Sequence, residues 1–402
     1  MTTQSSSPTV RTVVLSLGFT QAIAWASSTY LPAILATPIA RDLGISRSTV
    51  FAAFSASLLV MATLGPAIGR TIDRRGGRGV LVCSNLTLAF GLLTLGIAHS
   101  ELALFVAWAI LGAGMALGLY DAAFSALVKV YGTAARSPIT GITLLGGFAS
   151  TVGWPLTAYL ENELGWRATC FVWAALHICI ALPLNWRFVP AGEVLLAAPV
   201  KLQGSAHSPP ERPKASKRAF AWMAVYFAAT SFVTSAYAAH LPTLLVALGT
   251  SPSAALVAAS LLGPAQVAAR LAEFGVVSRF GLQSLTLARI ATLMHPVAAV
   301  MLLILGGGAS PAAAFVLLHG AGNGMITIAK GTLPLSVFGP FGYGRLQGWL
   351  AVCGRLMQAA APLAFSLLIE GYGGRIAMLA SGLFGLVSLA ALFALRQPVR
   401  DI

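Results

Sequence analysis

Charged residues are scarce in this chain. Only 9% of its 402 residues are Asp, Glu, Lys or Arg, whereas 57% are hydrophobic. A soluble domain carries about 25% charged residues, so this chain has too few to cover the surfaces of several water-soluble domains. The shortage argues against an ordinary soluble enzyme and makes the position of each charge informative.

Acidic residues are rarer than basic ones. The chain has 11 Asp and Glu against 25 Lys and Arg, a formal net charge of +14. Such an excess alone would suggest a nucleic-acid partner. The basic residues, however, gather in short loops between apolar stretches, for example at Arg70, Arg74, Arg75 and Arg78. This placement is typical of the cytoplasmic loops of a membrane protein, so we expect no nucleic-acid partner.

Cysteine is also sparse and forms no metal-binding pattern. The four residues are Cys83, Cys170, Cys179 and Cys353, without a CxxC pair. Cys170 and Cys179 are nine residues apart, about 13.5 Å along a helix, which exceeds the reach of a disulfide. We expect buried, unbridged side chains and no metal site.

The sequence lacks the short motifs of common enzymes. It contains no G-x-x-x-x-G-K-[ST] phosphate loop, no H-E-x-x-H and no G-x-S-x-G, so nothing indicates ATP hydrolysis, metalloprotease or serine-hydrolase chemistry. We expect no catalytic residues, no enzymatic activity and no cofactor. A membrane-embedded enzyme, a channel or a receptor remain as alternatives.

Long apolar stretches, in contrast, occupy most of the chain. A helix needs about 20 predominantly apolar residues to cross a hydrocarbon core of about 30 Å. Twelve stretches qualify, and those at residues 102–128 and 344–369 tolerate the internal charges Asp121 and Arg355. They cover residues 12–37, 48–69, 79–98, 102–128, 137–160, 168–187, 219–246, 252–274, 284–306, 311–336, 344–369 and 376–395. The sequence therefore predicts an all-α integral membrane protein with twelve transmembrane helices.

The distribution of charge predicts the topology. The first apolar stretch is too long for a signal-peptide core and is read as a retained span. With the N-terminus inside, the outer loops carry four basic and five acidic residues, and the other 21 basic residues fall in inner loops, tails or spans. Both termini are therefore expected in the cytoplasm.

One long hydrophilic connection divides the chain. Residues 187–218 contain Pro209-Pro210-Glu211-Arg212-Pro213-Lys214 and are predicted to be a cytoplasmic linker. Six spans lie on each side of it. The predicted domains are a bundle at residues 1–186 and a second bundle at residues 219–402.

The two halves resemble one another in sequence. Leu64-Gly65-Pro66-Ala67 recurs as Leu262-Gly263-Pro264-Ala265, and Tyr30-Leu31-Pro32 recurs as His240-Leu241-Pro242. Both pairs are separated by about 200 residues and keep the same order, which predicts a duplicated six-helix unit. Transporters built from such repeats bind their substrate near the middle of the membrane, between the halves.

The loop after the second span carries a family signature. Gly69-Arg70-Thr71-Ile72-Asp73-Arg74-Arg75-Gly76-Gly77-Arg78 resembles the G-x-x-x-D-R-x-G-R-K loop of the major facilitator superfamily (MFS). The 6+6 pattern, the central linker and the glycine- and proline-rich fifth span, with Gly153 and Pro155, extend the resemblance over the whole chain. It implies the MFS fold of two six-helix bundles and transport by alternating access.

The resemblance also implies a gate. In the family, the Asp and Arg of this loop latch the inner helix ends, which assigns Asp73, Arg74 and Arg78 to a cytoplasmic gate. Gly77 stands where a basic residue is usual, and the counterpart loop in the second half is degenerate, so the latch is expected to be asymmetric.

The fourth span helps to choose a branch of the family. Trp108 occupies the position of an Arg found in a branch of proton-driven drug exporters. The region around Trp25, the run Gly118-Leu119-Tyr120-Asp121 and the run Gly165-Trp166-Arg167 look more like the bacterial branch that resembles monocarboxylate transporters. This resemblance implies a multi-pass protein of the bacterial inner membrane.

Charges inside the spans are candidate functional residues, because each costs at least about 2.5–3.5 kcal/mol at the bilayer centre. Asp121 lies near the inner end of its span and is either a structural partner for Arg74 or Arg78 or a proton-coupling carboxylate. Arg355 lies about 16 Å deep. It is a candidate for binding an anionic substrate group, or else an internal anchor, and Gln358 would share its helix face.

Polar pairs in other spans extend the candidate site. His319 and Asn323 are spaced i, i+4, as are Gln21 and Trp25, and the resemblance places spans 1, 4, 7 and 10 around the cavity. The alternatives are a packed, neutral histidine at His319 and lipid-facing or packing roles for Gln21 and Trp25. Tyr237 and His240 are candidates for an outer gate. Structural roles are expected for His177, His295, Arg270 and Lys330.

These observations predict a secondary active transporter for a small molecule, with an organic anion or polar metabolite favoured, coupled to protons. The alternative is an efflux carrier that confers resistance to a toxic compound, such as a drug or a metalloid like arsenite. The expected partners are the substrate, protons and the lipid bilayer, and the expected state is a monomer.

Overall fold

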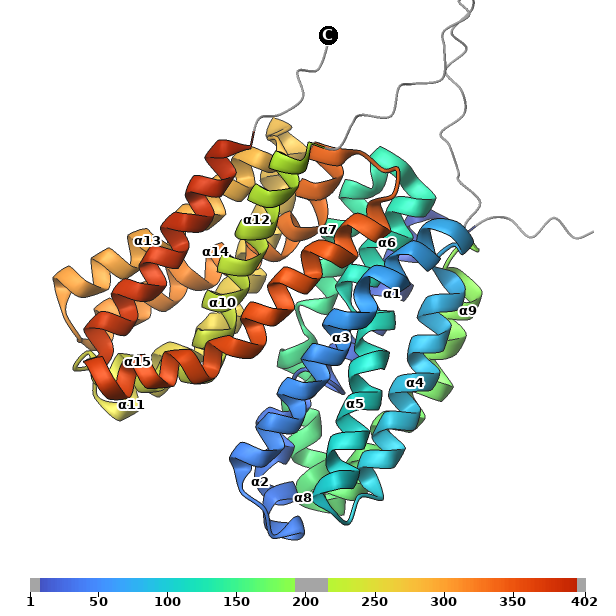
Figure 1. The fold of residues 1–402 in the computed structure, drawn as a ribbon, viewed down its shortest axis with the longest axis horizontal. Coiled ribbons are helices and arrows are strands. Elements are labelled where there is room, and N and C mark those ends of the chain that lie inside the picture. Colours follow the sequence, from blue (N-terminus) through green and yellow to red (C-terminus); the bar gives the residue numbers. More distant parts are fainter. Residues whose placement is uncertain (1–7, 192–215, 396–402) are drawn as a thin grey trace, which may run out of the picture. The chain divides into compact units, whose positions relative to one another are not determined.

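The structure, a computed structural model, describes residues 8–191 and 216–395 (Figure 1). Every regular element in those two ranges is helical. Nine helical stretches within them are long and apolar enough to cross a membrane. The central part of the predicted linker, residues 192–215, lies outside the described ranges.

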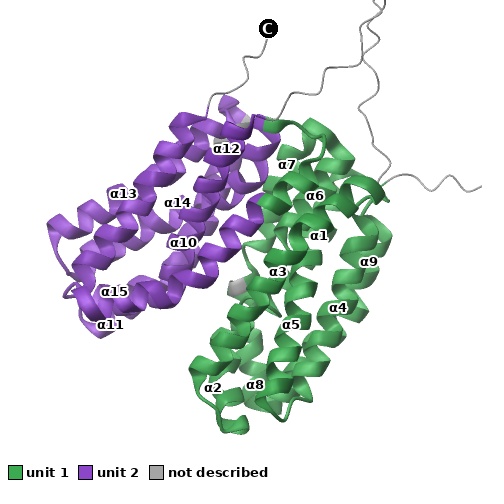
Figure 2. Cartoon of the chain, viewed as in Figure 1, with its two compact units in different colours: residues 1–214, 338–349 green, residues 215–337, 350–402 purple. Residues whose placement is uncertain are grey.

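The chain divides into two compact units, each described here by itself (Figure 2). Unit 1 comprises residues 1–214 and 338–349, and unit 2 comprises residues 215–337 and 350–402. The short segment Phe338–Trp349 thus groups with the first half of the chain, although the repeat pattern assigned it to the second bundle. The domain boundaries inferred from sequence stay a prediction.

Unit 1 is built from helices α1 to α9. Their bounds are α1 Val10–Ala26, α2 Leu31–Leu43, α3 Arg47–Arg75, α4 Arg78–Gly96, α5 Glu101–Gly118, α6 Tyr120–Tyr131, α7 Arg136–Gly146, α8 Ala149–Leu176 and α9 Leu182–Phe188. A 3₁₀ turn, Gly132–Ala135, joins α6 to α7, and a π-helical segment, His177–Ala181, joins α8 to α9.

Unit 2 is built from the remaining helices. Their bounds are α10 Lys217–Ala247, α11 Pro252–Ser260, α12 Leu262–Phe280, α13 Ser284–Leu305, α14 Ala309–Phe338 and α15 Tyr343–Ala394. The first residues of α15 belong to unit 1. The core of unit 2 is aromatic and includes Tyr237, Phe315 and Phe365, all completely or almost completely buried.

Short polar loops separate the helices as the sequence suggests. Ser46 accepts a hydrogen bond from the Thr49 amide (3.0 Å) at the start of α3, and Ser100 accepts one from the Ala103 amide (3.2 Å) at the start of α5. These side chains satisfy amides that have no partner within the helix. Gly44, at φ 65°, ends α2 in the left-handed conformation that glycine adopts without strain.

Glycine breaks reconcile the nine long stretches with the twelve predicted spans. The stretch Glu101–Phe188 is interrupted at Gly132 and Gly165, and the stretch Tyr343–Ala394 is interrupted at Gly373, all at positive φ. Gly165 (φ 78°, ψ 165°) and Gly373 (φ 81°, ψ 168°) have the same backbone conformation. Each lies between the fifth and sixth predicted span of its half, so the local geometry repeats along with the sequence.

Several predicted spans are less regular than expected. Residues 12–37 divide into α1 and α2, and residues 102–128 divide after Gly118. Residues 137–160 divide between α7 and α8, residues 168–187 include the π-helical segment, and residues 252–274 divide at Leu261. Pro32 lies in the first turn of α2, a position that tolerates proline because the amide there has no helical partner. Apolar composition predicts that a stretch spans the membrane, but it does not predict where the helix bends.

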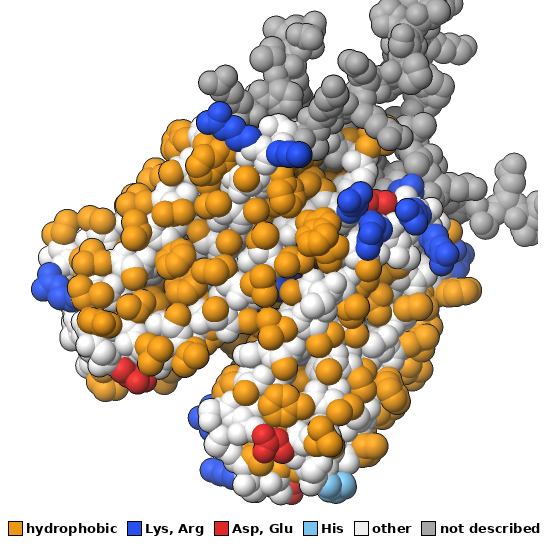
Figure 3. All heavy atoms as spheres, in the orientation of Figure 1, with side chains coloured by type: hydrophobic (Ala, Val, Ile, Leu, Met, Phe, Trp, Pro, Cys, Tyr) orange, Lys and Arg blue, Asp and Glu red, His pale blue; other side chains and the backbone are white. Residues whose placement is uncertain are grey.

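Large apolar side chains remain exposed along the helices. Leu102, Ile304 and Phe393 are 75%, 77% and 62% exposed, and hydrophobic side chains cover much of the visible helix surface in Figure 3. Contiguous exposure on this scale is unfavourable in water. It matches helices whose outer faces contact lipid.

Candidate functional site

A polar face of α10 connects two other helices of unit 2. Ser235 donates a hydrogen bond from Oγ to the Gln358 carbonyl oxygen on α15 (2.8 Å). Arg355 donates from Nη1 to Oε1 of Gln358 (2.7 Å). The structure therefore brings Arg355 and Gln358 together, as their i, i+3 spacing predicts, and Gln358 contacts α10.

A second cation meets the same face of α10. Lys330 on α14 donates from Nζ to Oγ of Ser231 (2.8 Å), and its ammonium lies 5.7 Å from the ring centroid of Phe227. Ser231 precedes Ser235 by four residues and therefore lies one turn away on the same side of the helix. Lys330 thus contacts the face of α10 that carries these two serines, and Gln358, the partner of Arg355, contacts it through its carbonyl oxygen.

Close helix packing makes this arrangement possible. A Cβ added at Gly354 would lie 2.9 Å from Oγ of Ser231, so glycine lets α15 approach α10 at this level without displacing that hydroxyl. Asn323 joins the face from α14, where its Oδ1 accepts a hydrogen bond from Thr234 (2.7 Å). We refer to Ser231, Thr234, Ser235, Asn323, Lys330, Arg355 and Gln358 as the basic polar face.

His319 contacts a different part of unit 2 from its predicted companion Asn323. Its Nδ1 lies 3.0 Å from Nδ1 of His295 on α13, and both histidines are at most 4% exposed. In such a bond one ring donates and the other accepts. A proton added to the accepting nitrogen would remove the bond, so the contact requires that nitrogen to be unprotonated.

Tyr237 packs on the same histidine pair. Its ring centroid is 4.7 Å from that of His319 and 5.4 Å from that of His295, and its hydroxyl lies 2.6 Å from Oγ of Ser381. His240, one turn further along α10, makes a hydrogen bond from Nε2 to the Pro362 carbonyl oxygen (2.8 Å). Tyr237 is thus a core residue of unit 2, and the outer-gate role of this pair stays a prediction.

The first candidate pair of unit 1 lies beside a helix break. Gln21 is 2% exposed and donates from Nε2 to the Gly118 carbonyl oxygen (2.6 Å), at the end of α5. The Trp25 ring lies 5.0 Å from Tyr120 and 6.0 Å from Tyr30, measured between centroids. Oε1 of Gln21 and Nε1 of Trp25 are buried without a partner among the described protein atoms. An acceptor and a donor are therefore available one helical turn apart.

Asp73 of the predicted gate caps a helix. Its two carboxylate oxygens accept the amides of Gly344 and Arg345, each at 2.8 Å, at the start of α15. A carboxylate at a helix N-terminus satisfies unpaired amides and interacts favourably with the helix dipole. A Cβ on Gly69, one turn earlier on α3, would collide with the Gly344 carbonyl oxygen.

The other predicted gate residues differ in their contacts. Asp121 accepts a hydrogen bond at Oδ1 from Nε2 of Gln347 (3.0 Å), a fully buried residue of α15. Arg78 donates to the Val189 carbonyl oxygen, beyond the end of α9. Arg74 is exposed. The sequence did not single out Gln347 as a partner of Asp121, because 226 residues separate them.

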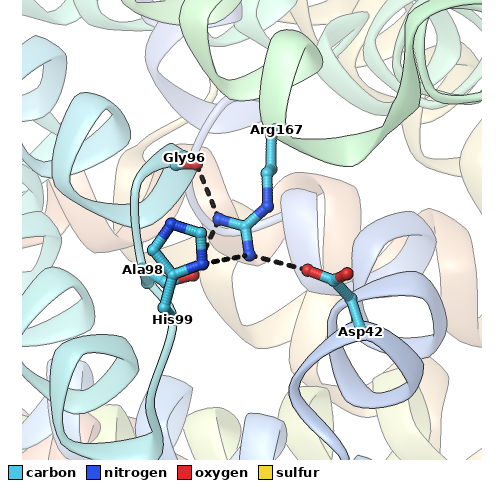
Figure 4. Close-up of polar contacts among 5 residues, drawn as sticks. All are labelled: Asp42, Gly96, Ala98, His99 and Arg167. Atoms are coloured by element: carbon cyan, nitrogen blue, oxygen red, sulfur yellow. Dashed lines mark hydrogen bonds and ion pairs between the residues drawn. The ribbon is translucent and has the colours of Figure 1, made fainter.

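Arg167 forms a network at one end of unit 1 (Figure 4). Its Nη1 donates to the carbonyl oxygens of Gly96 (3.0 Å) and Ala98 (2.7 Å), and its Nη2 lies 2.7 Å from Oδ2 of Asp42 and 3.2 Å from Nδ1 of His99. The single guanidinium ties the loop after α4 and the end of α2 to α8.

Arg167→Ala is expected to lower the free energy of unfolding by about 1–3 kcal/mol, because it leaves several acceptors without their charged donor. Asp42→Asn should cost less than about 1 kcal/mol, because that carboxylate is 46% exposed. Thermal unfolding of the two variants in detergent shows which of them loses more stability. Equal losses would show that the ion pair, rather than the carbonyl contacts, dominates.

The serines of α10 are not among the residues expected from the sequence, which predicts a structural role for Lys330. A usable signal was present, since Ser231, Thr234 and Ser235 recur at i, i+3 and i+4 on an otherwise apolar helix. Among the described residues, no group of three or more His, Cys, Asp or Glu side chains is arranged to hold a metal ion.

Comparisons with known proteins place the chain in a family. The family model described as Major Facilitator Superfamily matches residues 17–362. An uncharacterized 38 kDa protein of Thermoproteus tenax is 30% identical over 153 residues, 38% of this chain and 40% of that protein. An MFS-type efflux pump of Mycolicibacterium smegmatis is 31% identical over 184 residues, 44% of this chain and 41% of the pump. The matched regions thus cover about two fifths of the length of these curated relatives.

Solved structures share the fold at low sequence identity. The human organic anion transporter MFSD10 (TETRAN) aligns with a TM-score of 0.71 at 16% identity, over 96% of this chain and 100% of that chain. The MFS transporter FucP, in the outward conformation, aligns with a TM-score of 0.73 at 14% identity, over 96% and 98%. With the helical architecture and the family match over most of its length, the chain belongs to the Major Facilitator Superfamily and is an integral membrane transporter, not an enzyme.

Proposed function

We propose that this protein is a secondary active transporter that moves a small organic anion by alternating access, coupled to protons. The basic polar face of unit 2 carries the proposal, because Lys330 bonds to Ser231 of α10 and Arg355 bonds to Gln358, whose carbonyl oxygen accepts from Ser235 of α10. Hydrogen bonds to Ser231 and to Gln358 orient the two cations without removing their charge. A site of this kind attracts a carboxylate or another oxyanion.

The structure of the face favours one class of substrate over others. An anionic substrate would interact favourably with the charges of Lys330 and Arg355, whereas a cationic drug would meet repulsion. Ser231, Thr234 and Asn323 add neutral groups that can exchange hydrogen bonds with hydroxyl or carbonyl groups of the substrate.

Proteoliposomes test the function directly. Uptake is measured for a panel of carboxylates, vitamins, drugs and arsenite, with and without an imposed pH gradient. We expect counterflow of one labelled organic anion against its unlabelled form, since a carrier exchanges its substrate whereas a channel only leaks. Counterflow of none of the anions in the panel would contradict the proposal.

Asp121 is the proposed proton-coupling carboxylate, and a structural role is the alternative. Asp121→Asn should abolish the stimulation of uptake by a pH gradient while counterflow continues, because exchange needs no net proton movement. Gln347→Leu, which removes the hydrogen-bond donor but leaves the carboxylate, is the control and should keep the pH dependence. Full pH dependence in Asp121→Asn would assign the residue to structure.

Efflux of a toxic compound is the second candidate function, favoured by the similarity to the mycobacterial efflux pump. Inside-out and right-side-out vesicles distinguish the directions, because a proton-coupled efflux carrier concentrates its substrate in inside-out vesicles whose lumen is more acidic than the bath. We further propose a monomer in a bacterial inner membrane with both termini in the cytoplasm. Protease accessibility of terminal tags in the two kinds of vesicle checks this topology.

A further inference from the structure

Unit 1 has an apolar groove that is separate from the residues discussed above. Its volume is about 760 Å³, and helices α1, α7, α8 and α9 and the π-helical segment line it. Leu15, Phe19, Phe148, Val152 and Ile180 line the groove and are also exposed on the protein surface. The groove is therefore open to the side of the helices, where the bilayer lies. We call it the lateral groove.

Irregular helix geometry forms the walls of the lateral groove. One wall contains the turn at Gly147 between α7 and α8, and another contains the π-helical segment His177–Ala181. A π-helical turn widens a helix locally and often marks a functional position. At one end the helices meet closely, since a Cβ added at Gly153 would lie 2.5 Å from Cβ of Ala26.

Basic residues lie at the opposite end. Helices α1 and α9 run antiparallel, because Ser27 pairs with His177 (2.8 Å) while Ser16 pairs with the Leu184 carbonyl (3.3 Å). Thr12 and Phe188, which line the groove, are consequently at the same end. The neighbouring residues Arg11 and Arg187 are both exposed, so two guanidinium groups are available where the groove ends.

The length of the groove suits a lipid chain. From Thr12 to Ala26, α1 rises about 21 Å, which exceeds half of a hydrocarbon core of about 30 Å. Lipid tails and apolar side chains are equally apolar, so burial alone selects no particular lipid. The choice between lipids must therefore depend on the head group, and two exposed arginines favour a negatively charged head group.

We propose that the lateral groove binds one acyl chain of an anionic phospholipid, with the lipid phosphate against Arg11 and Arg187. Guanidinium groups bind phosphate oxygens through paired hydrogen bonds. The lipid chain fills the space between α1 and the irregular walls. This site is independent of the transported substrate.

The test compares lipids retained by the purified full-length protein. The protein is incorporated into bilayers of phosphatidylglycerol and phosphatidylcholine mixed 1:4, extracted in mild detergent, and its bound lipids are counted by native mass spectrometry. We expect enrichment of phosphatidylglycerol over its share in the bilayer. Arg11→Gln and Arg187→Gln should each reduce the enrichment about fivefold. The matched control combines Arg41→Gln with Arg47→Gln, which removes two exposed arginines near the α2–α3 loop. It should retain the wild-type enrichment of phosphatidylglycerol.

A second variant tests the groove itself. Val152→Trp should fill the groove without altering the core, because Val152 is 60% exposed, and should abolish lipid retention while transport of the substrate continues. No enrichment in the wild type, an equal loss in the control, or full retention in Val152→Trp would each overturn the proposal. So would a loss of transport in Val152→Trp with unchanged lipid binding, which would assign the groove to the substrate.

Discussion

Arg355→Gln is expected to lower kcat/KM for uptake of the organic anion about 10- to 100-fold. The substitution removes a charge-assisted hydrogen bond worth about 1.5–3 kcal/mol, while glutamine can still bond to Gln358. Initial rates of uptake into proteoliposomes, measured over a range of substrate concentrations, give the ratio. Lys217→Gln is the matched control, because it removes an exposed cation from the start of α10 and should leave kcat/KM unchanged.

The double variant separates substrate binding from structure. Lys330→Gln should also weaken transport, and the combination with Arg355→Gln should show a coupling energy if both cations bind the same anion. Thermal unfolding of each purified variant establishes that the fold survives. Unchanged uptake of the anion by folded Arg355→Gln would rule out the binding role and leave Arg355 as an internal anchor.

Gly69→Val is expected to reduce transport by at least about tenfold. A side chain at this position would collide with the backbone of Gly344, where Asp73 caps the start of α15. The conformation in which α3 contacts α15 would then be lost or strained, and small-to-large changes at tight contacts typically cost about 1–3 kcal/mol. Counterflow rates in proteoliposomes measure the effect, because every exchange cycle must pass through this conformation if it belongs to the transport cycle.

Gly79→Val provides the control for this experiment. Gly79 lies near the start of α4 in the same basic loop region, and a Cβ there would meet nothing within 4 Å. The Gly79→Val variant should transport the substrate at the wild-type rate. Equal counterflow by Gly69→Val and wild type would show that the contact between Gly69 and Gly344 is not needed during transport.

The fold could be predicted from composition and pattern because a membrane imposes strong constraints. Backbone groups cannot remain unpaired in lipid, so a long apolar stretch must be a helix, and the twelve stretches correspond to helical segments of the described chain. The motif in the loop from Gly69 to Arg78 predicted membership of the major facilitator superfamily, and the family match over residues 17–362 confirms it. Bends were not predictable, since those at Ser27–Tyr30 and Leu119 depend on local turn geometry rather than on hydrophobicity.

The site was only partly predictable, because partners were chosen by spacing along a helix. Spacing correctly paired Arg355 with Gln358, which are neighbours within one turn. It also paired His319 with Asn323, but their side chains bond to different helices, α13 and α10. Two residues four positions apart share a face only approximately, and the neighbouring helices decide which contacts form.

The sequence alone determined that this protein lies in a membrane, has a repeated helical pattern and belongs to the major facilitator superfamily. Each of these follows from local composition or from a contiguous motif. Only the tertiary structure decided that Lys330 meets Ser231, that Asp73 caps α15, and that π-helical geometry helps to form a lateral groove. Those features depend on contacts between distant residues, and an apolar sequence constrains such contacts weakly because many packings bury similar surfaces.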